Sequence, residues 1–156
     1  MGRRAEFGAI GKMSSGYAGD IDVSEAWRLL NEDDRSILID VRTQAEWNFV
    51  GLPDIEATGR PLLTEEWQAF PGGAQNTTFA DDVASKLKAA GVPKDAPILC
   101  LCRSGQRSAS AAAALTAQGF SSCFNVAGGF EGGLDGNGHR GTTGGWKAAG
   151  LPWRQG

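Results

Sequence analysis

Two short, uninterrupted apolar segments constrain the fold of this chain more than any other feature. Residues 36–41 read Ser-Ile-Leu-Ile-Asp-Val, and residues 97–101 read Pro-Ile-Leu-Cys-Leu. Neither segment alternates apolar with polar side chains, as a strand with one face in water would. Each is therefore expected to be a strand buried on both faces, which is typical of parallel sheets that carry helices on both sides.

Helical patterns separate these strands from each other and from a third candidate strand over 122–126. Asp22 and Glu25 have the spacing of a capping box, and apolar residues on one helical face follow them. Thr78 is expected to cap a later helix, and 60–63 is a candidate edge strand. The expected helices cover residues 23–30, 44–49, 79–90 and 108–118.

The alternation of strands and helices predicts an α/β fold in which helices cover both faces of a central, mainly parallel sheet. A length of 156 residues and a hydrophobic fraction of 41% suit one globular domain. Residues 1–18 are expected to be a disordered expression leader, with Met13 as the natural start. The single domain is then expected over 19–156.

Charge and cysteine content exclude several classes of function. A formal net charge of −3 argues against a nucleic-acid partner, and no apolar run is long enough to span a membrane. Three cysteines form no disulfide framework and no signal peptide is visible, so a reducing, cytoplasmic setting is expected. Three cysteines and one histidine lack the paired spacing of a zinc site, and neither a metal nor a cofactor is expected.

The segment between the second buried strand and the alanine-rich helix carries the chemistry. Cys102 follows the strand at its carboxyl end, where parallel sheets place ligands. Backbone N–H groups of the loop that follows can form an anion-binding nest, helped by the positive end of the next helix. A thiolate held there becomes a nucleophile at neutral pH. Gly105 removes a Cβ where the turn is tightest, and Arg103 and Arg107 add positive charge.

The other two cysteines have a simpler interpretation. Cys100 lies within a buried strand and Cys123 lies within the third candidate strand. A cysteine in such a position is most often a small buried hydrophobic residue. The two are therefore expected to be structural, whereas polar residues surround Cys102.

Three motifs, in this order along the chain, resemble those of the rhodanese family. Residues 39–47 resemble its early Asp-Val-Arg…Glu-Phe/Trp signature, and the loop Cys102-Arg103-Ser104-Gly105-Gln106-Arg107-Ser108 resembles its active-site loop. Residues 125–130, followed by Gly145-Trp146-Lys147 and Gly150-Leu151-Pro152, resemble its closing Gly-Gly…Trp…Gly-Pro pattern. The similarity spans Asp22 to Trp153.

The resemblance implies a rhodanese-like three-layer α/β/α fold and a ping-pong sulfurtransferase. Cys102 would take a sulfane sulfur from thiosulfate or a persulfide and pass it to cyanide or a thiol, with a protein sulfur carrier as a further candidate partner. Asp40 and Arg42 would support the active loop, and the protein would be a monomer or a weak dimer. The implied substrate-binding residues are Arg103, Ser104, Gly105, Gln106, Arg107 and Ser108.

Two insertions depart from the family pattern. Residues 50–76 replace its Gly-His-Ile-Pro-Gly-Ala segment with a longer excursion, and residues 132–145 lengthen the closing motif. Both are expected to be surface loops; the alternative is that they flank the mouth of the site and select its substrate. The only histidine, His139, is expected to be exposed. Among the tryptophans, Trp47 and Trp67 are expected to pack in the core or at its rim, and Trp146 and Trp153 to pin the tail.

Two rival functions use the same loop. A Cys-dependent phosphatase or arsenate reductase also holds a thiolate among backbone amides, but its pattern has five residues between Cys and Arg and usually a His before the Cys. Here four residues separate Cys102 from Arg107, and Leu101 stands in place of the His. A non-catalytic module that binds a partner or senses oxidants through an accessible Cys102 is the other alternative.

Overall fold

Five parallel strands form the central sheet in the computed structural model, which describes residues 16–155. The two apolar segments of the sequence are β2 (Ile37–Asp40) and β5 (Ile98–Leu101), and every residue of both is buried. β5 lies at the centre of the sheet, between β2 and β6 (Cys123–Val126). β1 (Gly19–Ile21) and β4 (Leu62–Thr64) form the two edges, which gives the order β1-β6-β5-β2-β4.

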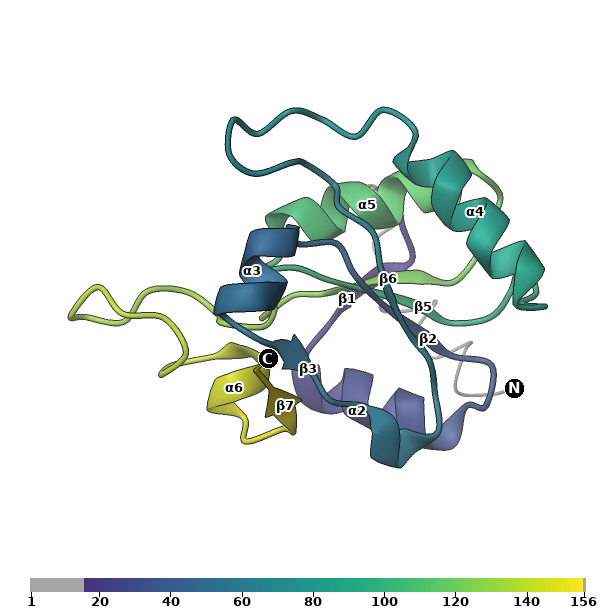
Figure 1. Ribbon diagram of the computed structural model, residues 1–156. Coiled ribbons are helices and arrows are strands. Elements are labelled where there is room, and N and C mark those ends of the chain that lie inside the picture. The colour runs from purple at the N-terminus through teal and green to yellow at the C-terminus, as the bar shows by residue number, and fades with distance from the viewer. Residues whose placement is uncertain (1–15, 156) are drawn as a thin grey trace.

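Helices lie on both faces of this sheet, so the predicted three-layer α/β fold is confirmed (Figure 1). α4 (Phe79–Ala89) and α5 (Gln106–Ala117) pack on one face. α2 (Val23–Glu32) and the short α6 (Gly145–Ala148) pack on the other, next to the single turn η2 (Glu56–Thr58).

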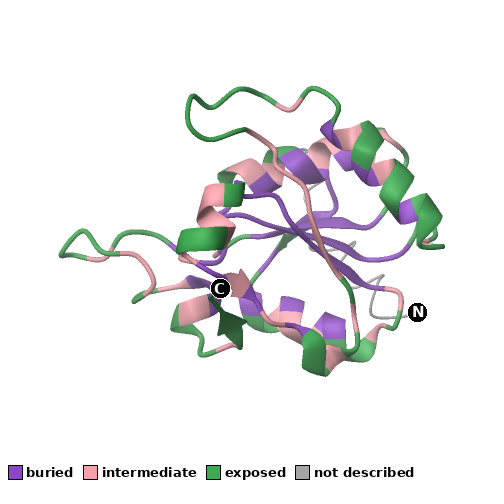
Figure 2. Ribbon diagram, viewed as in Figure 1, coloured by how far each residue is buried: buried purple, intermediate pink, exposed green. Residues whose placement is uncertain are grey.

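Successive residues of the central strand enter two different cores. Leu99 and Leu101 belong to the core under α2, whereas Ile98 and Cys100 belong to the core under α4 and α5. Figure 2 shows the consequence: β2, β5 and β6 are buried along their length, while α2, α4 and α5 are buried only on the side that faces the sheet. Cys102 belongs to the second core, so the candidate nucleophile leaves the strand on the side of α5.

The sequence predicted an N-cap residue for two helices, and only one of the two side chains makes the capping hydrogen bond. Asp22 caps α2 as expected, because its Oδ1 accepts a hydrogen bond from the backbone N–H of Glu25 at 2.8 Å. Thr78 is the N-cap residue of α4, as expected, but its side chain makes no capping hydrogen bond. Its backbone is not extended, and its hydroxyl donates to the Asp82 carboxylate at 2.8 Å instead.

The sequence did not predict the N-terminal details of two helices near the candidate site. α3 (Gln44–Phe49) begins with a complete capping box, in which Thr43 and Glu46 each bond the other's backbone N–H. α5 begins at Gln106, two residues before the expected 108, and Gly105 is its N-cap. The active loop is therefore shorter than the sequence pattern indicated.

Three very short strands were missed. β1 pairs with β6, and β3 (Leu52–Pro53) pairs antiparallel with β7 (Trp153–Arg154). Strands of two or three residues carry no readable alternation, which is why the sequence does not reveal them. The candidate edge strand over 60–63 is present as β4, shifted toward the C-terminus.

Tryptophan side chains fix the C-terminal segment. Trp146 is fully buried, and its indole Nε1 donates to the carbonyl of Pro152 at 2.6 Å. Trp153 packs edge-on against Phe130 but is 40% exposed, so it holds the tail less firmly. Trp67 packs edge-on against Phe79 at the core, as expected.

The expected leader lies mostly outside the described residues, because the structure describes the chain from residue 16. Tyr17 and Ala18, which the expectation placed in the leader, are buried, and the N–H of Ala18 bonds the carbonyl of Cys123 at 2.9 Å. Ordered packing thus begins before residue 19. Within residues 16–155 no helix is long and apolar enough to cross a bilayer, and no cluster of side chains there could hold a metal ion.

Candidate active site

Cys102 is the first residue after the central strand. Its loop connects β5 to α5, so it stands at the carboxyl end of the most buried strand and at the N-terminus of a helix. This is the position that the sequence predicted. A helix N-terminus carries partial positive charge and unpaired N–H groups, and both favour an anion.

Two polar groups contact the Cys102 sulfur. The backbone N–H of Gly105 lies 3.1 Å from Sγ, and the Ser108 hydroxyl oxygen lies 3.2 Å from it. Cys102 is only 1% exposed, so the expectation of an accessible side chain is wrong. The reason is that the sulfur sits beneath its own loop, within the core that α5 covers.

Ser108 connects the sulfur to a polar chain that sequence reasoning missed. The Ser108 hydroxyl lies 2.5 Å from Oδ1 of Asn125, and the Asn125 amide donates to the Asp20 carboxylate at 3.0 Å. Tyr17 donates its hydroxyl to the same carboxylate at 2.8 Å. Asn125 lies on β6 and Asp20 on β1, and the only sequence signal was a polar residue inside an apolar strand.

The backbone of the loop is held by residues 130–132. The N–H of Phe130 bonds the carbonyl of Cys102 at 2.8 Å, and the N–H groups of Glu131 and Gly132 bond the carbonyl of Arg103 at 3.0 and 3.1 Å. The C=O and N–H of one trans peptide point in opposite directions, so the N–H groups of Arg103 and Ser104 face away from residues 130–132. Neither N–H donates a hydrogen bond within residues 16–155, so both remain available to an anion.

Two glycines are required for this close packing. Gly105 has a φ of +113°, and a Cβ there would lie 2.5 Å from the carbonyl oxygen of Ala127. Gly129 has a φ of +67°, and a Cβ there would lie 2.7 Å from the backbone nitrogen of Ser104. Any other residue at either position would push the loop away from the closing motif.

Asp40 and Arg42 form a buried ion pair beside the loop. The guanidinium donates to the Asp40 carboxylate at 2.6 and 2.9 Å and to the carbonyl of Gly51 at 2.7 Å, and both side chains are fully buried. The same guanidinium lies 4.3 Å from the ring centre of Phe130, the residue whose N–H holds Cys102. These contacts are the ones that a supporting role requires, and that role stays a prediction.

Arg107 is held by a carboxylate from α3. Its two terminal nitrogens bond the two oxygens of Glu46 at 2.7 and 2.9 Å. Burial alone would raise the pKa of Glu46, but the hydrogen bonds from Arg107 and Thr43 outweigh it and lower that pKa to about 2. The Arg107 charge is thus largely neutralised. Of the other predicted loop residues, Arg103 and Gln106 are exposed and Ser104 is half-buried.

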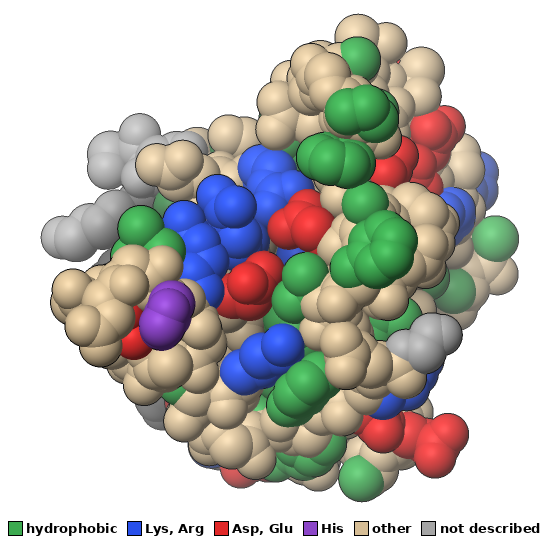
Figure 3. Space-filling view, turned by 60° about the vertical axis from the view of Figure 1, so that its left-hand side comes forward, with side chains coloured by type: hydrophobic (Ala, Val, Ile, Leu, Met, Phe, Trp, Pro, Cys, Tyr) green, Lys and Arg blue, Asp and Glu red, His purple; other side chains and the backbone are tan. Residues whose placement is uncertain are grey.

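A pocket of about 590 Å³ opens beside the loop. Both insertions contribute to it, which favours the alternative that they flank the site over the expectation of plain surface loops. Figure 3 shows basic and acidic side chains gathered in the hollow of one face, with hydrophobic side chains at its border. His139 is exposed, as expected, and does not line this pocket. Its charged lining residues are Glu46, Arg103, Arg107, Glu131 and Arg140.

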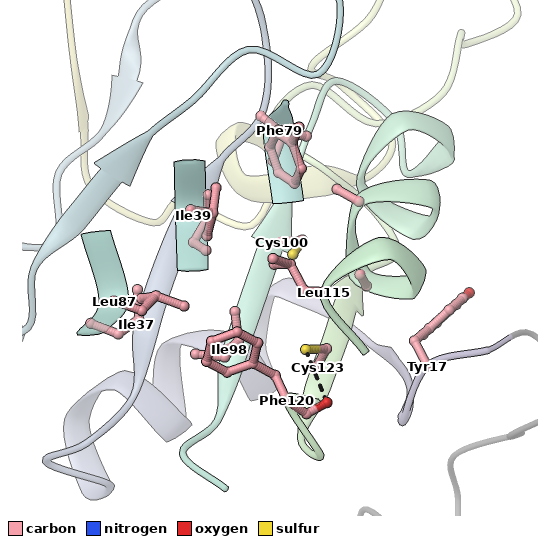
Figure 4. Packing of buried hydrophobic residues seen from close by; sticks show 14 of the residues in the cluster. Tyr17, Ile37, Ile39, Phe79, Leu87, Ile98, Cys100, Leu115, Phe120 and Cys123 are labelled. Atoms are coloured by element: carbon pink, nitrogen blue, oxygen red, sulfur yellow. Dashed lines mark hydrogen bonds between the residues drawn. The ribbon is translucent and has the colours of Figure 1, made fainter. Parts of the chain in front are cut away.

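The two remaining cysteines are core residues, as predicted (Figure 4). Burial raises the pKa of the Cys100 thiol well above its ordinary value, and it raises that of Cys123 to about 12. Both thiols therefore stay protonated at neutral pH, and neither is a candidate nucleophile.

Comparison with known proteins places the chain among characterised folds. A family model described as a rhodanese-like domain matches residues 22–135. The crystal structure of Rv0390 from M. tuberculosis superposes with a TM-score of 0.80 at 45% identity, covering 90% of this chain and 99% of that one. The polysulfide-sulfur transferase homodimer from Wolinella succinogenes gives a TM-score of 0.54 at 20% identity, over 99% of this chain and 86% of that one.

Curated relatives come from Rickettsia. The RP600 homolog of Rickettsia rickettsii, an uncharacterized protein, is 34% identical over 131 residues, which is 84% of this chain and 93% of that protein. RP600 of Rickettsia prowazekii, also uncharacterized, is 32% identical over the same shares of the two chains.

Proposed function

The chain belongs to the rhodanese-like domain family, and we propose that it is a sulfurtransferase in which Cys102 carries the sulfur between donor and acceptor. Thiosulfate or a persulfide would supply the sulfane sulfur, and cyanide or a thiol, free or on a protein sulfur carrier, would receive it. The Wolinella protein that shares the fold is named for the transfer of polysulfide sulfur, which agrees with this class of reaction.

With thiosulfate as donor, the Cys102 thiolate attacks the outer sulfur. A new bond forms between Sγ and that sulfur, the sulfur–sulfur bond of the donor breaks, and sulfite leaves with the electron pair. The acceptor then attacks the outer sulfur of the Cys102 persulfide. The bond to Sγ breaks, its electron pair returns to Cys102, and the thiolate is regenerated.

The polar contacts of Cys102 Sγ are the observation that carries the proposal. The sulfur accepts a hydrogen bond from the Gly105 N–H at 3.1 Å and lies 3.2 Å from the Ser108 hydroxyl, whose single proton can turn to the sulfur or to Oδ1 of Asn125. The unpaired N–H groups of Arg103 and Ser104 and the positive end of α5 supply further stabilisation for an anionic donor or persulfide.

Intact-mass spectrometry after incubation with thiosulfate tests the proposal. The chain is expected to gain about 32 Da, the mass of one sulfur atom, and to lose it on addition of cyanide. Cys102→Ser should abolish the gain, and Cys100→Ser, the matched change two residues earlier in the strand, should keep it. No gain with thiosulfate or with inorganic polysulfide, together with turnover of a phosphate ester, would establish the phosphatase alternative instead.

A further inference from the structure

The Ser108 hydroxyl has one proton and two neighbours that can accept it. Its oxygen lies 3.2 Å from Sγ of Cys102 and 2.5 Å from Oδ1 of Asn125. A serine hydroxyl donates a single hydrogen bond, so it can serve only one of these two atoms at a time. Ser108 is fully buried and Asn125 is 5% exposed, so bulk water does not replace either partner. The direction of this hydroxyl therefore decides whether the sulfur receives its donor.

Asp20 fixes the orientation of the Asn125 amide. The two residues are paired across β1 and β6, and Nδ2 of Asn125 donates to Oδ1 of Asp20 at 3.0 Å. A carboxylate can only accept hydrogen bonds, so the amide nitrogen must face Asp20 and the amide oxygen must face Ser108. Asn125 therefore presents a permanent acceptor to the Ser108 hydroxyl.

The chemical state of Cys102 determines which acceptor wins. When Cys102 is a thiol, its S–H can donate to Oγ of Ser108 and Ser108 can donate to Asn125, so every group has a partner. When Cys102 is a thiolate, Sγ can only accept, and the hydroxyl must turn to it at the expense of Asn125. In the persulfide the negative charge lies on the outer sulfur, and the hydroxyl can return to Asn125. These rotations transfer no proton, because the proton stays on Oγ.

We propose that Asn125, oriented by Asp20, is a positioning residue that draws the Ser108 hydroxyl away from Sγ as Cys102 gives up its charge to form the bond to sulfur. Asn125 competes with the thiolate for one proton, which makes the thiolate less stable and more nucleophilic. When the sulfur–sulfur bond forms, Asn125 regains its donor. The inference rests on the proposed function, since it assigns a residue that assists the uptake of sulfur by Cys102.

Other charged groups near Cys102 stay constant while the sulfur ionises. Arg107 and Cys100 also interact electrostatically with Cys102. Arg107 is paired with Glu46, and burial raises the pKa of the Cys100 thiol well above its ordinary value. Neither Asp20 nor Asn125 lines the pocket beside the loop. Substitutions at these two positions therefore test the sulfur without changing that pocket.

A titration of the Cys102 thiolate gives the first test. The ultraviolet absorbance of the thiolate is followed against pH, as the difference from Cys102→Ser. Asn125→Ala is expected to lower the midpoint of this titration by about one pH unit, because the hydroxyl then donates to Sγ without competition. Ser108→Ala is expected to raise the midpoint, because the sulfur loses this donor. A general loosening of the core would move both midpoints in the same direction.

Persulfide formation from thiosulfate gives the second test. At a pH where Cys102 is fully ionised, Asn125→Ala is expected to react about threefold more slowly than the wild type, because a more stable thiolate is a weaker nucleophile. The variant should therefore form its thiolate at a lower pH and yet react more slowly. A faster or equal rate in the fully ionised variant would overturn the inference.

A double-mutant cycle shows whether Asn125 acts through Ser108. In the Ser108→Ala background, Asn125→Ala should shift the titration midpoint little, because no hydroxyl remains to be directed. Equal shifts with and without Ser108 would overturn the inference. A shift by Asn125→Ala in the same direction as that of Ser108→Ala would do the same.

Asp20→Ala provides a test that does not disturb the core, because Asp20 is exposed on an edge strand. Without the carboxylate, Nδ2 of Asn125 can turn toward Ser108, so the midpoint should fall, by less than in Asn125→Ala. The shift should persist at about 1 M salt, where charges are screened within about 3 Å. Asp34→Ala, at an exposed aspartate after α2, is the matched control and should leave the midpoint unchanged. A shift that vanishes in salt would overturn the inference.

The proposed function and this inference fail separately. If the wild type gains no sulfur atom, the sulfurtransferase proposal fails, and the titrations still show whether Asn125 directs the hydroxyl. If the persulfide forms but the midpoint does not move in Asn125→Ala, only the inference about Asn125 fails.

Discussion

Glu46 and Arg107, 61 positions apart in the sequence, are joined by two hydrogen bonds of 2.7 and 2.9 Å. Glu46 is itself fixed by the capping box with Thr43 at the start of α3. Arg107 lies in the first turn of α5, directly after the loop that carries Cys102. The pair therefore fixes the first turn of α5 to α3, and this constrains the position of the loop that carries Cys102.

Glu46→Gln should weaken the interaction between α3 and the first turn of α5. The amide keeps the size of the side chain but removes its charge and one acceptor, which leaves a half-buried Arg107 without its partner. We expect the free energy of unfolding to fall by about 2 kcal/mol. Chemical denaturation measures this, and Glu32→Gln, which removes a helix-surface carboxylate paired with Arg28, is the control, with an expected loss below about 0.5 kcal/mol.

The same pair predicts a pH dependence of stability. The folded-state pKa of Glu46 is about 2, below its ordinary value of 4.5, so the unfolded chain binds this proton more readily than the folded one. The stabilisation is fully present above about pH 5 and is lost as the pH falls toward 2. The difference in unfolding free energy between wild type and Glu46→Gln should shrink over that interval; a constant difference would contradict the lowered pKa.

Ser108→Ala should slow the chemistry of Cys102. It removes a hydroxyl that lies 3.2 Å from Sγ and that donates to the buried Oδ1 of Asn125 at 2.5 Å. We expect the rate of persulfide formation from thiosulfate to fall about tenfold, measured by mass spectrometry over time. Ser110→Ala is the control, because Ser110 is exposed on the same helix. Equal rates in both variants would mean that the hydroxyl does not stabilise the thiolate.

Asn125 and Asp20 allow a charge-exchange test. Asn125→Asp places a carboxylate opposite Asp20 and close to the sulfur through Ser108. We expect lower stability and slower alkylation of Cys102 by iodoacetamide, each from like-charge repulsion. Adding Asp20→Asn restores the donor–acceptor match between the two positions. Stability should then return, but the alkylation rate should stay low because the buried charge remains near Sγ.

Gly105→Ala should damage both stability and activity. The alanine Cβ would stand 2.5 Å from the carbonyl oxygen of Ala127, at a φ of +113° that alanine rarely adopts. A loss of about 1 to 3 kcal/mol in unfolding free energy is expected. Gly133→Ala is the matched control, since no atom lies within 4 Å of a Cβ there. Thermal melts and persulfide formation are read together for both variants.

The sheet and the position of Cys102 at its carboxyl end could be predicted from the sequence for one physical reason. A strand buried on both faces is predominantly apolar, as 37–39 and 97–101 are, and a polar loop after such a strand stands out. The parallel sheet then places that loop at an edge where ligands bind. The roles of Cys100 and Cys123 followed from the same rule.

What the sequence did not predict depends on contacts between distant segments. The sequence identifies Glu46 only as part of a family motif, and its neighbours in the sequence do not indicate that it forms a hydrogen bond with Arg107. Asn125 is a single polar residue within a strand, and its partner Asp20 lies in a strand too short to recognise. The burial of Cys102 likewise arises from the packing of α5, which no local pattern reports.

Three backbone hydrogen bonds join the N–H groups of residues 130–132 to the carbonyls of Cys102 and Arg103. The loop can therefore reach its final conformation only after residue 132 has been synthesised. The ribosome adds Cys102 to the chain well before it adds residues 130–132, which hold the backbone of the Cys102 loop. A nascent chain that has passed Cys102 but not Gly132 therefore lacks the backbone hydrogen bonds that hold this loop. Under the proposed function, Cys102 can therefore take up sulfur only after the closing motif has docked.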